Sequence, residues 1–304
     1  MSIPLMLLGN ADCEDIEIIS SAGEDDSPTG LVEESVGSYS RAVVMTGGLP
    51  NEPPFVYHGI YFAGARGLLP VEVDLKLEFL EQGIYLVRGV EVSQLPYPSD
   101  HAAEMLAFSM VSHGQVRWDQ MLRLVKLLPC DANLRWAQSE CHAEAPHRFT
   151  SGAWNRGPMT GLTITARGFP WATAVLASVV ATWDEALNFS TCTLSLNVCA
   201  KPHRDRYNHG ESRNLAMPMS RFFGGELYVE AEAGRTRLSE DGPWGHVLEL
   251  SSPVSFTPKA LHASMPWHGT RLLLLAFHIG QVRNLSERSR AGLQKLGFRL
   301  GFLE

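Results

Sequence analysis

The chain has 304 residues, of which 45% are hydrophobic and 19% are charged, and its mean hydropathy is -0.05. This composition is typical of a globular protein and excludes collagen, coiled-coil and wholly disordered classes. The five cysteines form no CxxC pair, which argues against a disulfide framework and favours a reducing compartment. No apolar run approaches ~18 residues, and the first ten residues lack the basic region of a signal peptide. We therefore expect an intracellular protein without a membrane anchor.

The net charge of -8 is concentrated at the N-terminus. Residues 1–40 hold nine acidic residues and neither Lys nor Arg, so the rest of the chain carries a net charge of +1. We expect residues 1–40 to form a disordered acidic leader. From residue 201 onward Lys and Arg outnumber Asp and Glu by 14 to 10, a mild basic excess that leaves the class of partner open.

Residues 41–148 have the pattern of a mixed α/β extension. Short apolar runs between turn signals predict strands at Val71–Leu77 and Gly83–Val92. Ser99 or Asp100 is the candidate cap of a helix, because the apolar residues that follow recur at helical spacing.

Two further helices are predicted over Trp118–Leu128 and, after Pro170, over Trp171–Leu187. From Ser190 onward, short apolar runs separated by Gly and Pro favour a β-sandwich or jelly roll. The final element is a basic amphipathic helix that we expect to pack on the sheet. These predicted strands and the helix are Thr193–Asn197, Glu226–Glu230, His246–Leu250, Arg271–Ile279 and Ser286–Leu296.

The segment from Asn197 to Ser212 carries the strongest chemical signal. His203 and Asp205 are two residues apart, so on an extended strand both side chains point to the same face. An imidazole and a carboxylate presented together are two of the three ligands of the facial triad that non-haem Fe(II) oxygenases use. The third ligand should come from a distant strand, and His262 is the candidate. An HxD triplet alone is common by chance, so the prediction depends also on the features around it.

Arg271 lies nine residues after His262 and begins the run Leu272–Phe277, which is typical of a strand buried on both faces. Further upstream, Gly224 and Gly225 lead into another predicted strand. A cation at the mouth of a buried strand needs a partner, and a planar guanidinium suits a carboxylate. An edge residue in water is the alternative interpretation of Arg271.

The order of these features resembles Fe(II)- and 2-oxoglutarate-dependent dioxygenases on the double-stranded β-helix. The string from His203 to Asn208 is similar to the HxDxxN motif of the nucleic-acid-modifying branch that includes the TET and J-binding-protein enzymes. The continuation to Ser212 and the upstream Ser151–Trp154 look like the lead-in of relatives from algae and mobile elements. The resemblance covers about residues 149–283.

This resemblance implies an α+β fold with a double-stranded β-helix (jelly-roll) core in residues 149–304, supporting helices and a mixed N-terminal extension. It implies Fe(II) and 2-oxoglutarate as cofactors, with ascorbate as an alternative co-substrate. The implied site residues are His203, Asp205 and His262 for iron, Arg271 and Asn197 for the co-substrate, and Asn208, Arg204, Arg206 and Ser212 for the substrate.

The reaction implied is hydroxylation of the C5-methyl group of 5-methylcytosine or thymine in nucleic acid, DNA more than RNA, which would place the protein in the nucleus. A duplex hides that carbon, so the base has to be flipped into the pocket. Arg204, Arg206 and Arg213 crowd the metal strand and are candidate phosphate contacts, with a solvated basic loop as the alternative interpretation. The alternatives are a protein or small-molecule hydroxylase of the same superfamily and a non-catalytic β-sandwich interaction module. The oligomeric state stays open.

Overall fold

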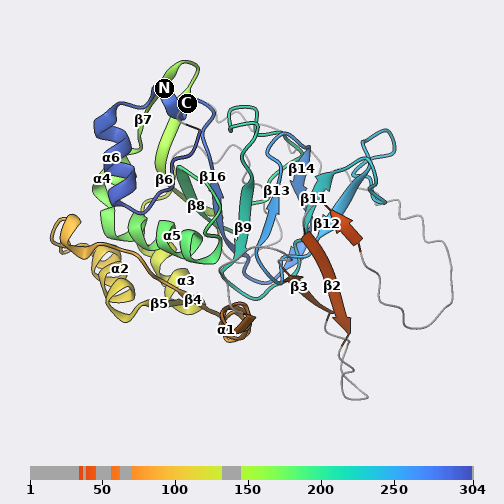
Figure 1. The fold of residues 1–304 in the computed structure, drawn as a ribbon, viewed down its shortest axis with the longest axis horizontal. Coiled ribbons are helices and arrows are strands. Elements are labelled where there is room, and N and C mark those ends of the chain that lie inside the picture. The colour runs from red at the N-terminus through yellow and green to blue at the C-terminus, as the bar shows by residue number, and fades with distance from the viewer. Residues whose placement is uncertain (1–33, 37–38, 46–55, 62–69, 132–144, 303–304) are drawn as a thin grey trace, which may run out of the picture.

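The computed structural model describes residues 34–36, 39–45, 56–61, 70–131 and 145–302, with side-chain environments from residue 76 onward. Helices gather on one side of the molecule, and antiparallel β-sheets form the rest (Figure 1). The predicted α+β class is therefore confirmed.

The larger sheet has six antiparallel strands in the order β13-β9-β16-β8-β6-β7. Its central strands β8 (Thr191–Leu196) and β16 (Leu272–Phe277) pair along their whole length and are almost entirely buried. The sequence of β16 is apolar throughout, as expected of a strand covered on both faces, whereas β8 alternates Thr and Ser with Cys and Leu and buries both sets. The flanking strands are β6 (His147–Arg156), β7 (Met159–Leu162), β9 (Asn214–Pro218) and β13 (Val254–Phe256).

A smaller antiparallel sheet packs against the larger one. Ala216 and Leu273 of the larger sheet share an apolar cluster with Leu227 and Val229 of the smaller sheet. The two sheets therefore bury their facing apolar side chains together, as in a sandwich. The smaller sheet comprises β12 (Gly245–Leu248), β11 (Leu227–Glu230) and β14 (His262–Ser264), and a separate two-stranded ladder pairs β10 (Phe223–Gly224) with β15 (Trp267–His268).

Helix α5 (Pro170–Trp183) covers the outer face of the larger sheet (Figure 1). Every residue from Trp171 to Val180 is buried, because the helix has the sheet on one side and α2 (Ala102–His113) on the other. Apart from Thr173 and Ser178 this stretch is apolar, as expected of a helix that is covered all round. Further helices are α3 (Trp118–Leu127), α4 (Ile164–Gly168) and α6 (Glu287–Lys295), with a 3-10 turn η2 at Val282–Asn284.

The predicted strand at Val71–Leu77 is wrong, because these residues lie in helix α1 (Pro70–Glu81). The alternating apolar residues suggested a strand, whereas Pro70, at the first helical position, was the competing helix signal. Of the predicted strand Gly83–Val92, only β4 (Ile84–Leu86) forms, paired with β5 (Gln115–Arg117), and a 3-10 turn η1 follows at Val92–Gln94.

The predicted cap of α2 is also wrong. His101, rather than Ser99 or Asp100, is the capping residue, and its Nδ1 accepts a hydrogen bond from the Ala103 amide at 3.2 Å. For α6 the sequence left Asn284 and Ser286 as candidate caps, and Ser286 is the capping residue: its hydroxyl accepts a hydrogen bond from the Ser289 amide at 3.2 Å.

The predicted acidic leader lies mostly outside the described residues. At its C-terminal end, β1 (Glu34–Val36) and the start of β2 (Tyr39–Met45) are strands, and β2 also pairs with β3 (Val56–Tyr61). Regular structure therefore begins before residue 40. Among the described helices, none is long and apolar enough to cross a bilayer.

Candidate metal centre

His203 and His262 face each other across an isolated antiparallel bridge. The His203 amide donates to the His262 carbonyl at 3.0 Å, and the His262 amide donates to the His203 carbonyl at 2.9 Å. His262 begins β14, which is held in the smaller sheet by β11. Because directly opposed residues place their side chains on the same face, this pairing brings the two imidazoles together, with ring centroids 4.3 Å apart.

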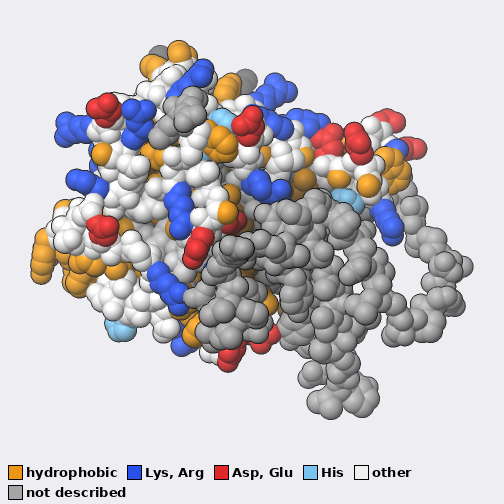
Figure 2. Space-filling model, in the orientation of Figure 1, with side chains coloured by type: hydrophobic (Ala, Val, Ile, Leu, Met, Phe, Trp, Pro, Cys, Tyr) orange, Lys and Arg blue, Asp and Glu red, His pale blue; other side chains and the backbone are white. Residues whose placement is uncertain are grey.

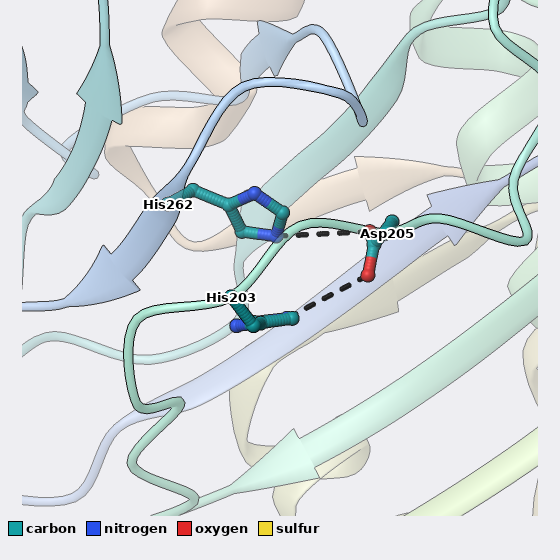
Figure 3. Close-up of side chains that lie close together, drawn as sticks. All are labelled: His203, Asp205 and His262. Atoms are coloured by element: carbon teal, nitrogen blue, oxygen red, sulfur yellow. Dashed lines mark ion pairs between the residues drawn. The ribbon is translucent and has the colours of Figure 1, made fainter.

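Asp205 completes a three-residue cluster with the two histidines (Figure 3). Its Oδ1 lies 3.6 Å from Nε2 of His203, and its Oδ2 lies 3.6 Å from Nε2 of His262. One ligand atom from each residue lies within 4.8 Å of the other two, so the cluster can hold a metal ion. The separations exceed hydrogen-bond length and leave the nitrogens and oxygens pointing at a shared space. The convergence that an iron site requires is present, and the bound metal stays a prediction.

Both imidazoles are oriented for metal binding by backbone carbonyls. Nδ1 of His203 lies 2.7 Å from the Lys201 carbonyl, and Nδ1 of His262 lies 2.9 Å from the Ala260 carbonyl. A carbonyl can only accept, so each Nδ1 carries a proton, and Nε2 is the ring nitrogen that faces Asp205 and can bind a metal. Burial lowers the pKa of His262, which further favours the neutral, ligating form.

The Asp205 carboxylate is held by two asparagines. Nδ2 of Asn214 donates to Oδ2 at 2.6 Å, and Nδ2 of Asn208 donates to the same oxygen at 3.2 Å. The Asp205 amide donates to the Pro258 carbonyl at 2.9 Å, which fixes the backbone. These contacts restrict the carboxylate to one orientation facing the histidines, as outer-shell partners do in metal sites.

Arg271 is a buried cation, only 3% exposed, and not the water-exposed edge residue of the alternative interpretation. Its Nε and Nη2 donate to the Gly225 carbonyl at 3.1 and 3.0 Å, and its guanidinium lies over the rings of Trp267 and Phe222. Burial lowers its pKa to about 10, so it stays charged at neutral pH. Within the described residues no carboxylate forms an ion pair with it, so the charge is available to an anionic ligand.

Gly225 makes this arrangement possible. It has φ +70, and a Cβ there would lie 2.9 Å from Cβ of Trp267 and 3.0 Å from Nε of Arg271. Only glycine lets the carbonyl approach the guanidinium so closely. The sequence pointed to the Gly224-Gly225 pair as the start of a strand, but its role as a hydrogen-bond acceptor for Arg271 was missed.

Asn197, the second residue predicted to bind the co-substrate, contacts the backbone of Arg271. Its Oδ1 accepts from the Arg271 amide at 2.9 Å, and its own amide donates to the Arg271 carbonyl at 2.8 Å. Asn197 is buried and has φ 50, a left-handed conformation that asparagine tolerates better than most residues. In this position it fixes where the Arg271 side chain begins; its contact with a co-substrate stays a prediction.

The predicted substrate-binding residues lie in different environments. Asn208 is half-buried on Asp205, and the Ser212 hydroxyl is buried and donates to the His209 carbonyl at 2.8 Å. Arg204 forms an ion pair with Glu230 and donates to the Lys259 carbonyl at 2.7 Å. Arg206 is exposed on the loop of residues 201–213, which carries His203 and Asp205 and is called the metal loop below. Contact of these four residues with a substrate stays a prediction.

Three residues that organise the site were not predicted. Asn214, Glu230 and Lys259 lie outside the motif, and the sequence gives no local signal that marks them. Their partners become visible only when the sheets bring segments far apart in the chain together.

No protein-family model and no curated protein sequence matches the chain. Solved structures match weakly. They include an oxidoreductase of the 2OG-Fe(II) oxygenase family from Burkholderia pseudomallei, at 12% identity and TM-score 0.32 over 61% of this chain and 96% of that one. A Pseudomonas putida prolyl-4-hydroxylase matches at 13% identity and TM-score 0.30 over 69% and 100% of the two chains. A Trichoplax adhaerens prolyl hydroxylase matches at 10% identity and TM-score 0.32 over 72% and 90%.

Likeness at this level carries no argument about the fold or the reaction. The case for the site therefore rests on its own geometry: two imidazoles oriented by backbone carbonyls, one fixed carboxylate, and a buried arginine that forms no ion pair among the described residues.

Proposed function

We propose that the protein is an Fe(II)- and 2-oxoglutarate-dependent oxygenase on a double-stranded β-helix, and that its substrate is a methylated pyrimidine in nucleic acid. The observation that carries the proposal is the convergence of His203, Asp205 and His262 within 4.8 Å. Two imidazoles and one carboxylate are the donor set that suits Fe(II) with positions left open for other ligands. A non-catalytic module has no need for such convergence. When bound, iron and 2-oxoglutarate supply oxygen activation coupled to loss of CO2 and hydroxylation of a C–H bond.

Arg271 supports 2-oxoglutarate as the co-substrate. A buried guanidinium that bonds to one carbonyl is only partly compensated for its desolvation, and a carboxylate would complete its coordination. The rings of Trp267 and Phe222 flank the cation and restrict an approaching anion to the plane of the guanidinium. In this proposal Arg271 binds and orients the carboxylate of 2-oxoglutarate that lies remote from the metal.

Nucleic acid as the substrate is supported by the exposed rim of the metal loop. Lys201, Arg206 and Arg213 are exposed around the site, and Tyr207 between them is 69% exposed. Cations that can meet phosphates and an aromatic ring that can stack on a base are the groups that bind extended nucleic acid. Arg204 is already paired with Glu230, so the phosphate contacts fall to the other three cations.

Asn208 supports a cytosine rather than a thymine. A carboxylate only accepts hydrogen bonds, so Asn208 must present its NH2 group to Asp205, which leaves Oδ1 as the acceptor for a ligand. Cytosine carries an amino donor at C4, whereas thymine carries an acceptor there. We therefore infer 5-methylcytosine as the preferred base, flipped out of its stack to reach the metal.

The test is nucleoside mass spectrometry. The full chain, Fe(II) and 2-oxoglutarate are incubated with matched DNA and RNA oligonucleotides containing 5-methylcytosine or thymine, with ascorbate alone in parallel and His203→Ala as the control. We expect 5-hydroxymethylcytosine that the control does not form.

Other outcomes separate the parts of the proposal. If 2-oxoglutarate is consumed and no base is oxidised, the oxygenase stands and the nucleic-acid substrate is replaced by a protein or metabolite. If ascorbate alone supports the reaction, 2-oxoglutarate is not the co-substrate. If neither co-substrate is consumed and no metal binds, the non-catalytic module replaces the enzyme.

A further inference from the structure

Lys259 joins two segments that each supply metal ligands. It lies exposed in the stretch 258–261, directly before His262. Its Nζ donates to the backbone carbonyls of Arg206 at 2.9 Å, Asn208 at 2.7 Å and Asp205 at 3.3 Å. An ammonium group has three protons, so all of its donors are used on the loop that carries Asp205. The loop wraps around the side chain although the lysine belongs to another segment.

The stretch around Lys259 is also fixed to the smaller sheet. Leu261 exchanges two contacts with Glu230 of β11: its amide donates to Oε2 at 2.8 Å, and its carbonyl accepts from the Glu230 amide at 2.8 Å. The Lys259 carbonyl accepts from Arg204, which is paired with the same glutamate. The backbone around Lys259 is therefore fixed to the smaller sheet, while the ammonium group of the side chain binds the loop that carries Asp205.

Electrostatics alone would not place a lysine here. A cation close to a site that takes a dication repels that ion and weakens its binding. The contacts of Lys259 must therefore contribute something that outweighs the repulsion. Because both Asp205 and His262 depend on the segments that Lys259 connects, the contribution is the relative position of the two ligands.

We propose that Lys259 is a positioning residue, which holds the 205–208 loop against β14 so that Asp205 and the histidines meet in a metal-ready geometry. The inference rests on the proposed metal site. The positioning role predicts that Lys259→Met lowers the affinity for the metal. Loss of the lysine's charge repulsion alone would raise that affinity, so the two explanations predict opposite changes.

The first measurement is Co(II) titration of the full chain, followed by the visible absorption of the bound ion. Lys259→Met removes the ammonium group, and Lys295→Met on helix α6 is the matched control. We expect the affinity for Co(II) to fall about tenfold in Lys259→Met, as for other outer-shell partners, and to stay unchanged in the control. Lys259→Arg, which keeps the charge and several donors, should recover part of the loss.

The second measurement does not depend on metal. Hydrogen–deuterium exchange of the metal-free protein should accelerate in the peptide that covers residues 203–208 in Lys259→Met and not in Lys295→Met. Unchanged exchange, or faster exchange with equal or tighter Co(II) binding, overturns the positioning role. If the wild-type chain binds no Co(II), both the metal site and the positioning role of Lys259 are refuted. If the wild type and Lys259→Met bind Co(II) equally well, only the role of the lysine is refuted.

Discussion

The environment of Arg271 gives the clearest indication of an anionic ligand. Removing a guanidinium from water costs several kcal/mol, and one carbonyl acceptor with two aromatic faces offsets that cost only in part. A protein that needed stability alone would gain by placing an apolar side chain there. The retained cation is thus better explained by a ligand that carries a carboxylate.

Arg271→Met should therefore separate binding from stability. We expect the KM for 2-oxoglutarate to rise about 100-fold, because the charge-assisted contact is lost. The thermal midpoint should stay equal or rise, because a buried cation has been replaced by an apolar side chain of similar length. Steady-state kinetics of succinate formation and thermal denaturation check the two effects. An unchanged KM together with a lower midpoint would assign Arg271 a structural role.

Asn214 should matter to the metal although it cannot touch it. Its 2.6 Å hydrogen bond is the shortest that Asp205 accepts from a side chain among the described residues. In Asn214→Ala we expect the affinity for Co(II) to fall about 10- to 100-fold, because the carboxylate is free to rotate. Ser212→Ala is the control, since its hydroxyl bonds to the His209 carbonyl instead. Equal affinities in the two variants would contradict the role of Asn214.

At the element scale, the start of α5 depends on a charge from another helix. Glu104 of α2 is 1% exposed, and its carboxylate accepts from the amides of Trp171 at 3.1 Å and Ala172 at 3.0 Å. These amides are among the first of α5, where the helix leaves its N–H groups without partners and favours a negative charge. The contact therefore fixes α2 on α5.

Glu104→Ala should destabilise the protein by about 1–3 kcal/mol, because two buried amides lose their acceptors. Glu104→Gln keeps one acceptor oxygen and should cost less. Urea unfolding with an unchanged m-value measures the free energy of unfolding. If the urea midpoint of Glu104→Ala equals that of the wild type, the contact between Glu104 and the start of α5 contributes nothing to stability.

His278, directly after β16, makes the packing of the C-terminal segment sensitive to acid. Its ring is fully buried against Phe302, and its carbonyl accepts from the His209 amide of the metal loop at 2.9 Å. Burial, followed by repulsion from His209, lowers its pKa to about 4. Above the unfolded-state pKa of about 6.5 both states hold a neutral ring. As the pH falls from there toward 4, only the unfolded state takes up the proton, so stability is lost.

From this shift we expect His278 to account for about 2 kcal/mol of the stability lost between pH 8 and pH 5. His278→Phe removes the titrating group and keeps an aromatic ring, so its loss over the same interval should be smaller by that amount. Denaturant unfolding at the two pH values measures this difference, and the pH 8 value reports the packing of the new ring. An equal loss in both proteins would mean that the buried ring does not titrate in this interval.

The sequence allowed prediction where the signal is local. Apolar residues and Pro170 marked the helices Trp118–Leu127 and Pro170–Trp183, and the apolar run Leu272–Phe277 marked β16. The short run predicted at Thr193–Asn197 marked most of β8. His203 and Asp205 lie two residues apart in one segment, so their common face could be inferred. Partners such as Asn214 and Lys259 could not, because only the folded sheets bring them to the metal loop.

At the scale of the whole molecule, charge is distributed unevenly. Figure 2 shows acidic side chains gathered near the hairpin of β11 and β12, and Lys and Arg spread over the rest of the described part of this face. Exposed Glu232, Glu240 and Asp241 lie in that hairpin. A polyanion bound at the metal loop would be repelled from this side, so its phosphates should follow the cations on the loop instead.

The helices of the N-terminal extension share one core with the larger sheet. Met110 and Met121 of α2 and α3 belong to the same buried cluster as Phe149, Leu194 and Leu293, which come from the predicted catalytic domain. Helix α5 is buried from Trp171 to Val180, because it lies between the larger sheet and α2. The predicted boundary at residue 148 therefore divides the sequence, while the apolar packing is continuous across it. We expect the described residues 76–131 and 145–302 to unfold cooperatively.

Calorimetry of two core variants tests this unity. Met121→Ala in α3 and Leu194→Ala in β8 each remove a side chain that is fully buried, at a cost of about 2–5 kcal/mol. If helices and sheet form one cooperative unit, both variants lower the midpoint of the same transition by about 5–15 °C and leave no second transition at the wild-type temperature.

If the extension were a separate domain, Met121→Ala would shift one transition and leave the other where it is. In that case the metal site would survive the melting of the helices, and Co(II) absorption followed on heating would persist beyond the first transition. In a single unit the absorption disappears with the only transition, because the loop that carries Asp205 loses the sheets that hold it.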